Sequence, residues 1–519
     1  MRDVAVRQLL SRATALAGMA LLTACAVGPD FRAPEPPQIT RYTREPLAAH
    51  TVSTGSAGGS AQRFVSGRDI PLQWWTVFKS PALNALVERS LQNNPTVQSA
   101  LASLRAAKQA VYAQEGKFFP LVQANFNPTR QQTSAAIAPV PNSGATIFDL
   151  YTAQLQLTYT FDVWGQNRRA VESLEALADT QRFQVEAAYL TLTSNVVVAA
   201  ITEASLRAQI DATNELIAAN TRSLRTLQQQ LNAGNINASL VAAQEAVVAQ
   251  ARATLPPLRK ALAQERDLLA ALSGGYPSEG PPETFKLEDL HLPTDLPLSV
   301  PSQLIEQRPD VRAAEEQLHS ASAQIGVATA NLLPSFTING NAGYMNTALA
   351  GLLAPQNFFW TIAGNAAQTI FDGGTLYHQL KQSEDNYQAA AWTYRGTVVT
   401  AVQNVADTLH ALQNDADALQ AALQFQRAAQ QSLRLAQQQL AQGAVNILVL
   451  FSAQQTYLPA VIQVVQARAA RLTDTAALFQ ALGGGWWNLT EPYTAKVLNV
   501  STDETKTILE PPGVHPDGD

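Results

Sequence analysis

The chain has 519 residues, more than one hydrophobic core usually serves, so its length predicts several domains or an elongated body. Only 15% of the residues are charged, and acidic residues outnumber lysine and arginine to give a net charge of −6. An acidic chain without a basic cluster argues against binding to nucleic acid. After residue 24 no segment reaches the roughly 18 consecutive apolar residues of a transmembrane helix, so any membrane crossing must use strands.

The N-terminus carries the only cysteine of the chain, Cys25, at the end of a Leu-Thr-Ala-Cys sequence that follows a basic start and an apolar run. This order predicts a lipoprotein signal peptide over residues 1–24, with the thiol of Cys25 as the group that a lipid alkylates. The next residue is Ala26 and not an aspartate, which resembles an outer-membrane signal. The alternative is an ordinary secretion signal followed by a free cysteine. Residues 25–70 are expected to form the lipid anchor and an extension rich in Pro, Gly and Ser.

An internal repeat occupies most of the mature chain. Asn94-Pro95 and the helix predicted after it recur 214 residues later as Arg308-Pro309, and later pairs of matching motifs lie 209 or 210 residues apart. We therefore predict two copies of one structural unit. Repeat 1 covers residues 71–280, a linker covers 281–300, repeat 2 covers 301–487, and residues 488–519 form a polar C-terminal tail.

Each repeat is expected to run as helix, strand, strand, long helix, turn and helix. Pro120 and Pro334 end the first helices. The residues after them alternate between apolar and small polar side chains, which is typical of strands with lipid on one face and water on the other. A soluble, half-buried sheet would alternate in the same way. Four aromatic residues at the ends of predicted strands are candidates for an aromatic girdle: Tyr344, Phe358, Phe359 and Trp360.

Two long helices follow the predicted strands, and Asp162 and Asp372 are expected to cap their first turns. No proline interrupts the chain from about residue 168 to 231 or from about 376 to 440, and each stretch would form a helix about 96 Å long. Their small and apolar positions predict side-by-side packing with other helices. Gly234 and Gly443 end these helices, and Asn237 and Asn446 cap the return helices, so we expect two antiparallel hairpins with matching tips. The return helices contain Pro256-Pro257 and Pro459, and we expect a kink or a break at each place.

The predicted strands number four per chain, which is too few for a membrane-spanning sheet. Such a sheet must close, because an open edge leaves backbone groups without partners in lipid. Known barrels start at eight strands. Several chains must therefore share one barrel.

The motifs of the chain, taken in order, closely resemble the outer membrane factor family, and the main ones are Cys25-Ala26-Val27-Gly28-Pro29-Asp30-Phe31, Trp74-Trp75-x-x-Phe78, Phe371-Asp372-Gly373-Gly374 and Leu482-Gly483-Gly484-Gly485-Trp486. The chain looks like a TolC-like duct of the lipid-anchored NodT-type branch. The resemblance implies a mainly α fold with transmembrane β, in which a homotrimer shares a 12-stranded barrel and long helical hairpins form a periplasmic tunnel. It also implies a periplasmic adaptor (membrane fusion) protein and an inner-membrane RND or MFS pump as partners.

The resemblance places the closed periplasmic end and the adaptor contact at the two hairpin tips. The tip residues that match are Leu231, Gly234 and Asn237 in repeat 1, and Leu440, Gly443 and Asn446 in repeat 2. Turn chemistry alone explains the two glycines better than binding does. Many relatives carry an acidic residue nine positions after the second turn glycine, where this chain has Ser452. We therefore expect a periplasmic gate that closes by apolar packing of Val449, Leu450 and Phe451 beside Ser452.

The predicted function is the outer-membrane exit duct of a tripartite efflux system, lipid-anchored and extending into the periplasm, which passively conducts what the pump delivers. One alternative is the exit channel of a type I protein-secretion system. Another is a structural coiled-coil lipoprotein of the envelope. The six histidines lack metal-ligand spacing, and no nucleophile elbow or nucleotide-binding motif is present, so we predict no metal, no cofactor and no enzymatic activity.

Overall fold

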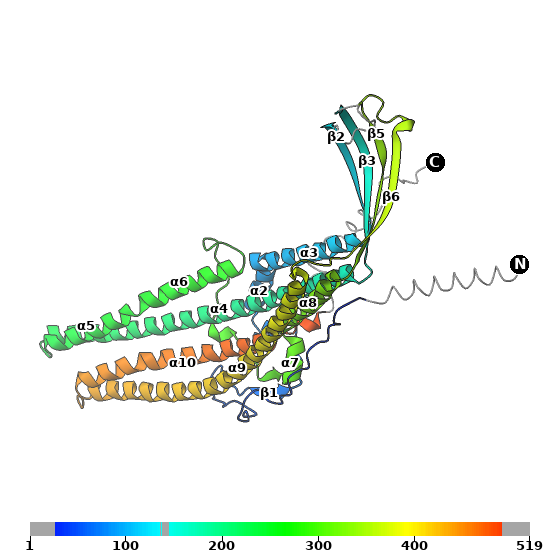
Figure 1. Ribbon diagram of the computed structural model, residues 1–519. Coiled ribbons are helices and arrows are strands. Elements are labelled where there is room, and N and C mark those ends of the chain that lie inside the picture. Colours follow the sequence, from blue (N-terminus) through cyan, green and yellow to red (C-terminus); the bar gives the residue numbers. More distant parts are fainter. Residues whose placement is uncertain (1–25, 135, 137–144, 490–519) are drawn as a thin grey trace, which may run out of the picture. The chain divides into compact units, whose positions relative to one another are not determined.

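The computed structural model describes residues 26–134, 136 and 145–489 of the chain (Figure 1). Within these residues, the same order of elements occurs in both halves. The first half contains α2 (Pro81–Asn93), α3 (Pro95–Glu115), β2 (Leu121–Gln132), β3 (Ile147–Phe161), α4 (Gln166–Asn232), α5 (Ala238–Ala253) and α6 (Leu255–Leu272). The second half contains α7 (Pro301–Gln307), α8 (Pro309–Asn331), β5 (Ser335–Asn346), β6 (Phe358–Ala367), α9 (Thr375–Ala441) and α10 (Ile447–Ala481). Helix, strand, strand, long helix, turn and helix therefore follow one another twice.

The long helices α4 and α9 contain 67 residues each, and a helix of that length measures about 100 Å when straight. Both begin and end within two residues of the predicted positions. Aspartates bond the first amides, as expected: Asp162 accepts from the backbone N–H of Arg168 at 3.0 Å, and Asp372 accepts from that of Leu376 at 2.8 Å. The amide of Leu376 holds the pKa of the Asp372 carboxyl below its ordinary value.

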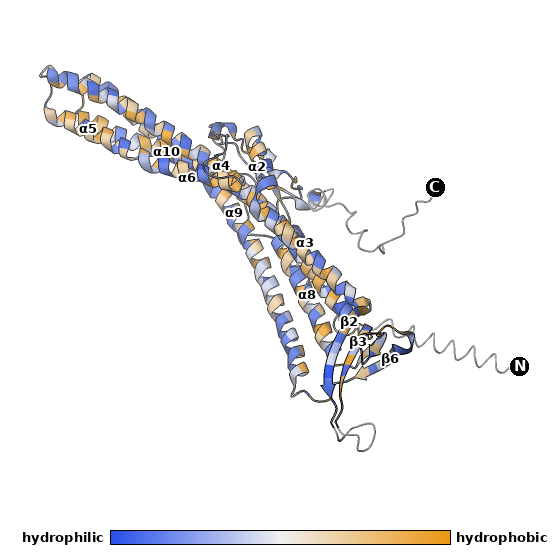
Figure 2. Cartoon of the chain, turned by 90° about the horizontal axis from the view of Figure 1, so that it is seen from above, coloured by the Kyte–Doolittle hydropathy of each residue, from blue (hydrophilic) through white to orange (hydrophobic). Residues whose placement is uncertain are grey.

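Two described helices, α4 and α10, each contain an 18-residue window that is long and apolar enough to cross a membrane. The share of that window buried within the chain is 61% in α4 and 44% in α10. Figure 2 shows apolar and polar residues mixed along these helices. A core helix of a soluble protein passes the same test, so the apolar residues of α4 and α10 are explained by helix packing.

Proline has different effects on the two return segments. Pro256 and Pro257 lie in the first turn of α6, and Thr254 separates α5 from α6, so the predicted break is present. Pro459 lies inside α10, which is continuous from Ile447 to Ala481. Of the predicted kink or break, a break is therefore absent at Pro459. The neighbours of Pro459 on both sides are buried, and their packing offsets the hydrogen bond that the proline removes.

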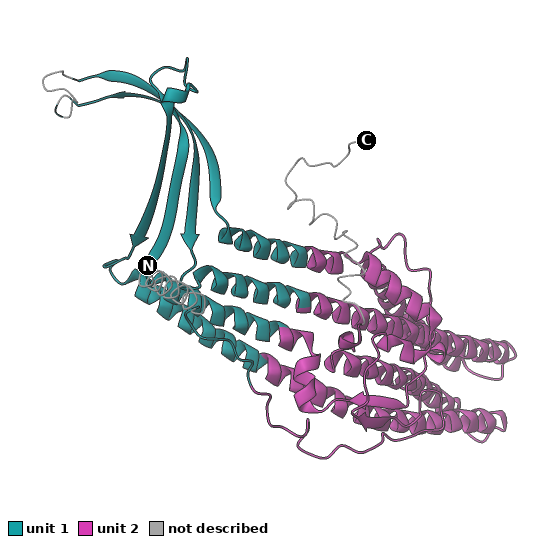
Figure 3. Cartoon of the chain, turned by 90° about the vertical axis from the view of Figure 1, so that its right-hand side faces the viewer, with its two compact units in different colours: residues 1–34, 103–182, 313–396 teal, residues 35–102, 183–312, 397–519 magenta. Residues whose placement is uncertain are grey.

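The chain divides into two compact units that do not follow the repeats (Figure 3). Unit 1 contains residues 1–34, 103–182 and 313–396, and unit 2 contains residues 35–102, 183–312 and 397–519. Each repeat contributes to both units. All four long strands belong to unit 1, and both hairpin tips belong to unit 2.

Unit 1 is built on an antiparallel sheet with the strand order β2-β3-β5-β6. β3 and β5 pair from Phe161 opposite Phe336 to Tyr151 opposite Asn346, so the hairpins of the two repeats join at the centre of the sheet. Within the described residues, β2 and β6 are paired on one side only. The predicted count of four long strands in each chain agrees with this sheet.

Unit 2 has a core of aromatic residues from distant parts of the sequence. Trp74 and Trp75 are buried, and the ring of Trp74 stacks on Phe479 with centroids 5.4 Å apart. Gly484 has a φ of +69°, and a Cβ at this position would lie 2.3 Å from Cδ1 of Leu190. Only glycine fits this turn, which brings the segment after α10 close to the buried tryptophans.

Unit 2 also contains two short strands that the sequence patterns did not indicate. β1 (Arg63–Ser66) pairs in parallel with β4 (Asp295–Leu298), which lies in the predicted inter-repeat linker. Arg471 of α10 is buried and donates hydrogen bonds to the carbonyl oxygens of Gly58 (2.7 Å) and Ser60 (3.0 Å). The N-terminal extension is therefore tied to the body of unit 2 just before β1.

Candidate functional site

One face of the four-stranded sheet is apolar across all four strands. Because side chains alternate along a strand, residues that pair in register and every second residue from them share a face. The register puts Gly340 of β5 between Leu157 of β3 and Ile362 of β6. The face consists of Val122, Ala124 and Phe126 in β2, Tyr151, Ala153, Leu155, Leu157, Tyr159 and Phe161 in β3, Phe336, Ile338, Gly340, Ala342 and Tyr344 in β5, and Phe358, Trp360, Ile362, Gly364 and Ala366 in β6.

The large side chains of this apolar face are exposed or half-buried, and none is fully buried. Trp360 is 65% exposed and Ile362 72%, and Val122, Phe126 and Leu155 are also classed among the exposed residues. Contiguous exposed apolar patches of this kind mark contact with a membrane or with another protein. The alternation predicted from the sequence is present, and it separates an apolar face from a polar one.

The opposite face of the sheet is polar and uncharged. Asn341 of β5 lies between Gln156 of β3 and Thr361 of β6, and Asn125 of β2 donates to the Gln156 side-chain oxygen at 3.4 Å. In the described strands β2, β3, β5 and β6, the only charged residues are Arg130 and Asp149, and they pair with each other on the side that continues the apolar face. The polar face therefore presents amides and hydroxyls without a fixed charge.

The four residues of the predicted girdle divide between the two faces. Tyr344 and Phe358 pair in register with ring centroids 5.6 Å apart, and Trp360 shares their face. Phe359 lies opposite Gly343 and therefore on the polar face. The prediction is corrected for Phe359, because consecutive residues of a strand point to opposite sides.

A second aromatic group, which the sequence did not single out, closes the other end of the apolar face. Phe161 pairs with Phe336, and the rings of Tyr159 and Phe161 are 5.0 Å apart. Phe336 and Tyr344 are eight positions apart, which corresponds to about 27 Å of antiparallel strand. The distance is comparable with the roughly 25 Å apolar band that aromatic girdles flank in outer-membrane barrels.

The two hairpin tips have the predicted turn geometry. Gly234 has a φ of +73° and Gly443 a φ of +71°, with open space where a Cβ would lie. The left-handed backbone alone therefore accounts for glycine at both positions. The side chains of Asn237 and Asn446 accept hydrogen bonds from backbone amides of the first helical turn at 3.3 and 3.1 Å.

An apolar cluster in unit 2 joins the two tips. Leu231 and Leu440 pack against it from the ends of α4 and α9. Its buried members are Leu227, Val241, Val247, Ile447 and Phe451. The two leucines of the predicted adaptor contact are therefore partly buried packing residues in the chain.

The four residues of the predicted gate differ in exposure. Leu450 packs against Ala436 and Ala453, and Phe451 belongs to the cluster between the tips, so both side chains lie inside the chain. Val449 is 45% exposed, and Ser452 is exposed as well. Of the four, Val449 and Ser452 are the ones whose side chains are available to face a lumen or another chain.

Unit 2 also contains an unusual carboxyl group. Burial raises the pKa of Asp415 in α9 to about 7, the neighbouring Asp474 adds to the rise, and the guanidinium of Arg471 opposes it. No group of three His, Cys, Asp or Glu residues that could hold a metal ion occurs in the part of the chain that the structure describes. Cys25 lies outside the described residues.

A sheet with one exposed apolar face and one neutral polar face, followed by paired long helices, is the architecture of an outer-membrane channel protein. The chain belongs to the outer membrane efflux protein family, whose sequence model matches residues 86–275 and 300–484. The predicted family is confirmed. The first matched segment lies within predicted repeat 1, and the second begins one residue before predicted repeat 2.

Relatives of this chain are named for efflux through the outer membrane. The antibiotic efflux pump outer membrane protein ArpC of Pseudomonas putida is 27% identical over 474 residues, covering 91% of this chain and 94% of ArpC. The pyoverdine export outer membrane protein OpmQ of Pseudomonas aeruginosa is 30% identical, covering 80% of this chain and 87% of OpmQ. The solved outer-membrane channel OprN has the same fold, with a TM-score of 0.78, 24% identity and coverage of 89% of this chain and 100% of OprN.

These comparisons confirm the predicted function in efflux and the predicted location in the outer membrane. The protein is an efflux duct of the outer membrane. The lipid anchor at Cys25 stays a prediction. Its relatives are channel and transport proteins.

Proposed function

We propose that three copies of this chain enclose one pore through the outer membrane. The free edges of β2 and β6 carry backbone groups that find no strand partner within the described chain, and lipid offers them none. Two copies would give an eight-stranded barrel, whose interior side chains fill. Three copies give twelve strands and leave room for a water-filled lumen.

The exposed apolar face of the sheet is the observation that carries this proposal. It faces lipid between the aromatic pair Phe161 and Phe336 at one end and Tyr344, Phe358 and Trp360 at the other. The neutral polar face lines the lumen. Because this face has no charged residue in the described strands, the barrel passes solutes without selecting them by charge.

The remaining parts of the proposed efflux system involve the lipid anchor and the two hairpin tips. Cys25 carries the lipid anchor in the outer membrane. A periplasmic adaptor binds the tips, where Gly234 and Gly443 shape the turns and exposed Val449 offers apolar contact. An inner-membrane pump of the RND or MFS type supplies energy, as the naming of the relatives as pump components supports. The chain itself acts as a passive conduit.

Conductance of the purified protein in planar lipid bilayers tests this proposal. We expect discrete channel openings, and we expect Asn341→Asp, which places three carboxylates around the lumen, to shift the reversal potential in a KCl gradient toward that of K⁺. Asn341→Gln is the matched control and should leave the reversal potential unchanged. Lack of any conductance would favour a structural envelope lipoprotein, and an unshifted reversal potential in Asn341→Asp would contradict the assignment of the polar face to the lumen.

A further inference from the structure

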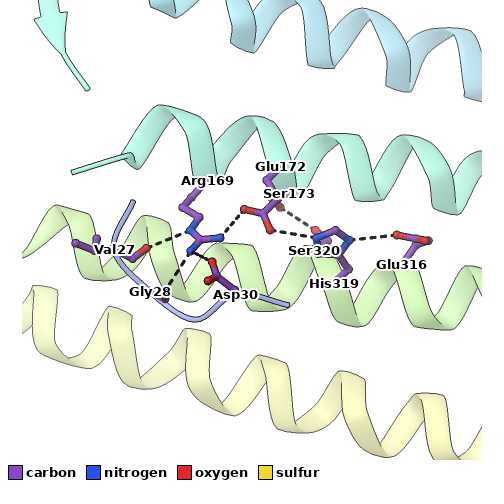
Figure 4. Close-up of polar contacts among 9 residues, drawn as sticks. All are labelled: Val27, Gly28, Asp30, Arg169, Glu172, Ser173, Glu316, His319 and Ser320. Atoms are coloured by element: carbon purple, nitrogen blue, oxygen red, sulfur yellow. Dashed lines mark hydrogen bonds and ion pairs between the residues drawn. The ribbon is translucent and has the colours of Figure 1, made fainter. Parts of the chain in front are cut away.

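Within unit 1, the segment directly after the predicted lipidation site packs against α4 and α8 (Figure 4). We call residues 26–31 the docked segment. The backbone N–H of Val27 donates to the carbonyl oxygen of Trp164 at 3.0 Å. Gly28 has a φ of +97°, and a Cβ at this position would lie 2.4 Å from Cα of Gly326 in α8. The backbone of the docked segment therefore lies directly on α8, at a place that only glycine can occupy.

Arg169 of α4 is the centre of the site that holds this segment. Its side chain is 6% exposed. The guanidinium donates to the carbonyl oxygens of Val27 (3.2 Å) and Gly28 (3.4 Å) and to the carboxylate of Asp30 (2.7 Å). The fourth acceptor is Glu172 of the same helix, at 2.7 Å. Three of the four hydrogen bonds that satisfy this cation come from the docked segment, so the segment supplies most of the protein partners of Arg169.

The far end of the docked segment is held by an aromatic contact. Phe31 stacks on the His319 ring of α8 with centroids 4.4 Å apart and an angle of 13° between the rings. Glu172 and Glu316 hold the His319 ring nitrogens at 3.1 and 3.3 Å. Figure 4 shows that Glu172 links Arg169 to His319, so one carboxylate supports both contacts with the segment.

We propose that this Arg169-centred site is a receptor for the chain's own N-terminal segment and fixes where the lipid anchor enters the membrane. A Cβ added to Gly165 would lie 2.7 Å from Cα of Ala26, so Ala26 touches the turn between β3 and α4. Cys25 is the next residue, and its Cα lies about 3.8 Å from that of Ala26. The acyl group is thereby held beside the end of the apolar sheet face, where Phe161 and Phe336 lie.

This inference rests on the proposed lipidation of Cys25 and gives the anchor a fixed position. A flexible extension would let an acylated N-terminus wander over many ångströms. With the segment docked, the lipid and the strands enter the bilayer at the same level. Arg169 is then a positioning residue for the anchor, and the bound ligand is a short peptide with a glycine, an aspartate and an aromatic ring in the order of residues 28, 30 and 31.

Hydrogen exchange of the full mature protein, purified in detergent, tests the site. We expect Arg169→Gln to make the amide of Val27, which donates to Trp164, exchange about tenfold faster, because the docked segment opens more often once its hydrogen bonds to a charged group are lost. Arg168→Gln is the matched control, since Arg168 contacts Asp162 and not the docked segment, and should leave the exchange of this amide unchanged. Trypsin should also cut after exposed Arg32 faster in Arg169→Gln than in the control.

The acylation state of the N-terminal peptide, read by mass in every variant, separates this inference from the proposed lipidation. Acylated wild-type protein whose Val27 amide exchanges as fast as in Arg169→Gln would overturn the docking site and leave the lipidation intact. An N-terminal peptide that is protected from exchange but carries no acyl group would overturn the anchoring role of the Arg169-centred site and leave the binding site itself intact. If Arg169→Gln also loses hydrogen-exchange protection in the strands, the substitution has disturbed the fold. In that case Asp30→Asn and Phe31→Ala test the contact instead, because they change only side chains of the docked segment. Unchanged exchange in both of these variants would contradict the inference.

Discussion

Two tryptophans show how differently the two units use apolar side chains. Trp74 of unit 2 is 1% exposed and stacks on Phe479, whereas Trp360 of unit 1 is 65% exposed and shares its face with Ile362, which is 72% exposed. Unit 2 completes its core within one chain. The sheet of unit 1 leaves a whole apolar face uncovered, so its stable environment includes material from outside the chain.

The largest effect is expected from a charge placed on the apolar face of the sheet. Ile362 lies at the middle of this face in register, and each lysine at the midplane of a bilayer costs about 2–4 kcal/mol. Ile362→Lys should therefore abolish most assembly, measured as folded protein in the outer-membrane fraction. Thr361→Lys, on the polar face of the same strand, should assemble normally. Equal losses in the two variants would contradict the separation of the faces.

Unit 2 should respond to loss of packing and not to loss of lipid contact. Trp74→Ala removes a fully buried ring, and we expect it to lower the free energy of unfolding by about 3–5 kcal/mol, seen as a lower melting temperature by circular dichroism. Tyr276→Ala alters a side chain that is 75% exposed and should change stability by less than about 0.5 kcal/mol. Similar melting temperatures for the two variants would show that the core is elsewhere.

A substitution at the hairpin tips should have a smaller effect, and the property affected is the ion selectivity of the channel. Ser452 is exposed beside buried Phe451, so Ser452→Asp adds three carboxylates to the assembled tips without disturbing the apolar cluster. We expect greater cation permeability of the reconstituted channel, with Ser452→Asn unchanged. Identical selectivity of the Asp and Asn variants would show that Ser452 does not face the lumen.

A further prediction concerns the pH dependence of stability. The pKa of Asp415 is about 7 in the folded protein, whereas the ordinary value of an aspartate is about 3.9. Between these values the folded protein holds a proton that the unfolded chain has lost, so stability falls as the pH rises through this window, and the full penalty is present above pH 7. Asp415→Asn should therefore raise the melting temperature relative to wild type at pH 8 and give a smaller gain at pH 4. An equal gain at both values would contradict the raised pKa.

The sequence predicts the parts of this fold that local signals determine. Asp162 and Asp372 start the long helices, Gly234 and Gly443 end them, and each acts through its own backbone conformation or a few neighbouring amides. Alternation predicts the two faces of the sheet for the same reason, because it depends only on adjacent residues.

Features that depend on register or on distant contacts could not be predicted. Alternation alone excludes Phe358, Phe359 and Trp360 from sharing one face, but which of them lies on the apolar face depends on the register, and composition does not specify the register. β1 and β4 have four residues each, too few to show alternation, and lie far apart in the chain. Arg169 contacts Asp30 across 139 residues, so nothing near Arg169 in the sequence indicates the docked segment.

Native mass spectrometry of the mature protein, released from detergent, tests the central claim most directly, because one chain provides only part of a closed barrel. We predict a single species with three times the mass of the mature chain, and Ile362→Lys should deplete it while Thr361→Lys leaves it intact. A stable, folded monomer whose four strands retain their pairing would contradict the account.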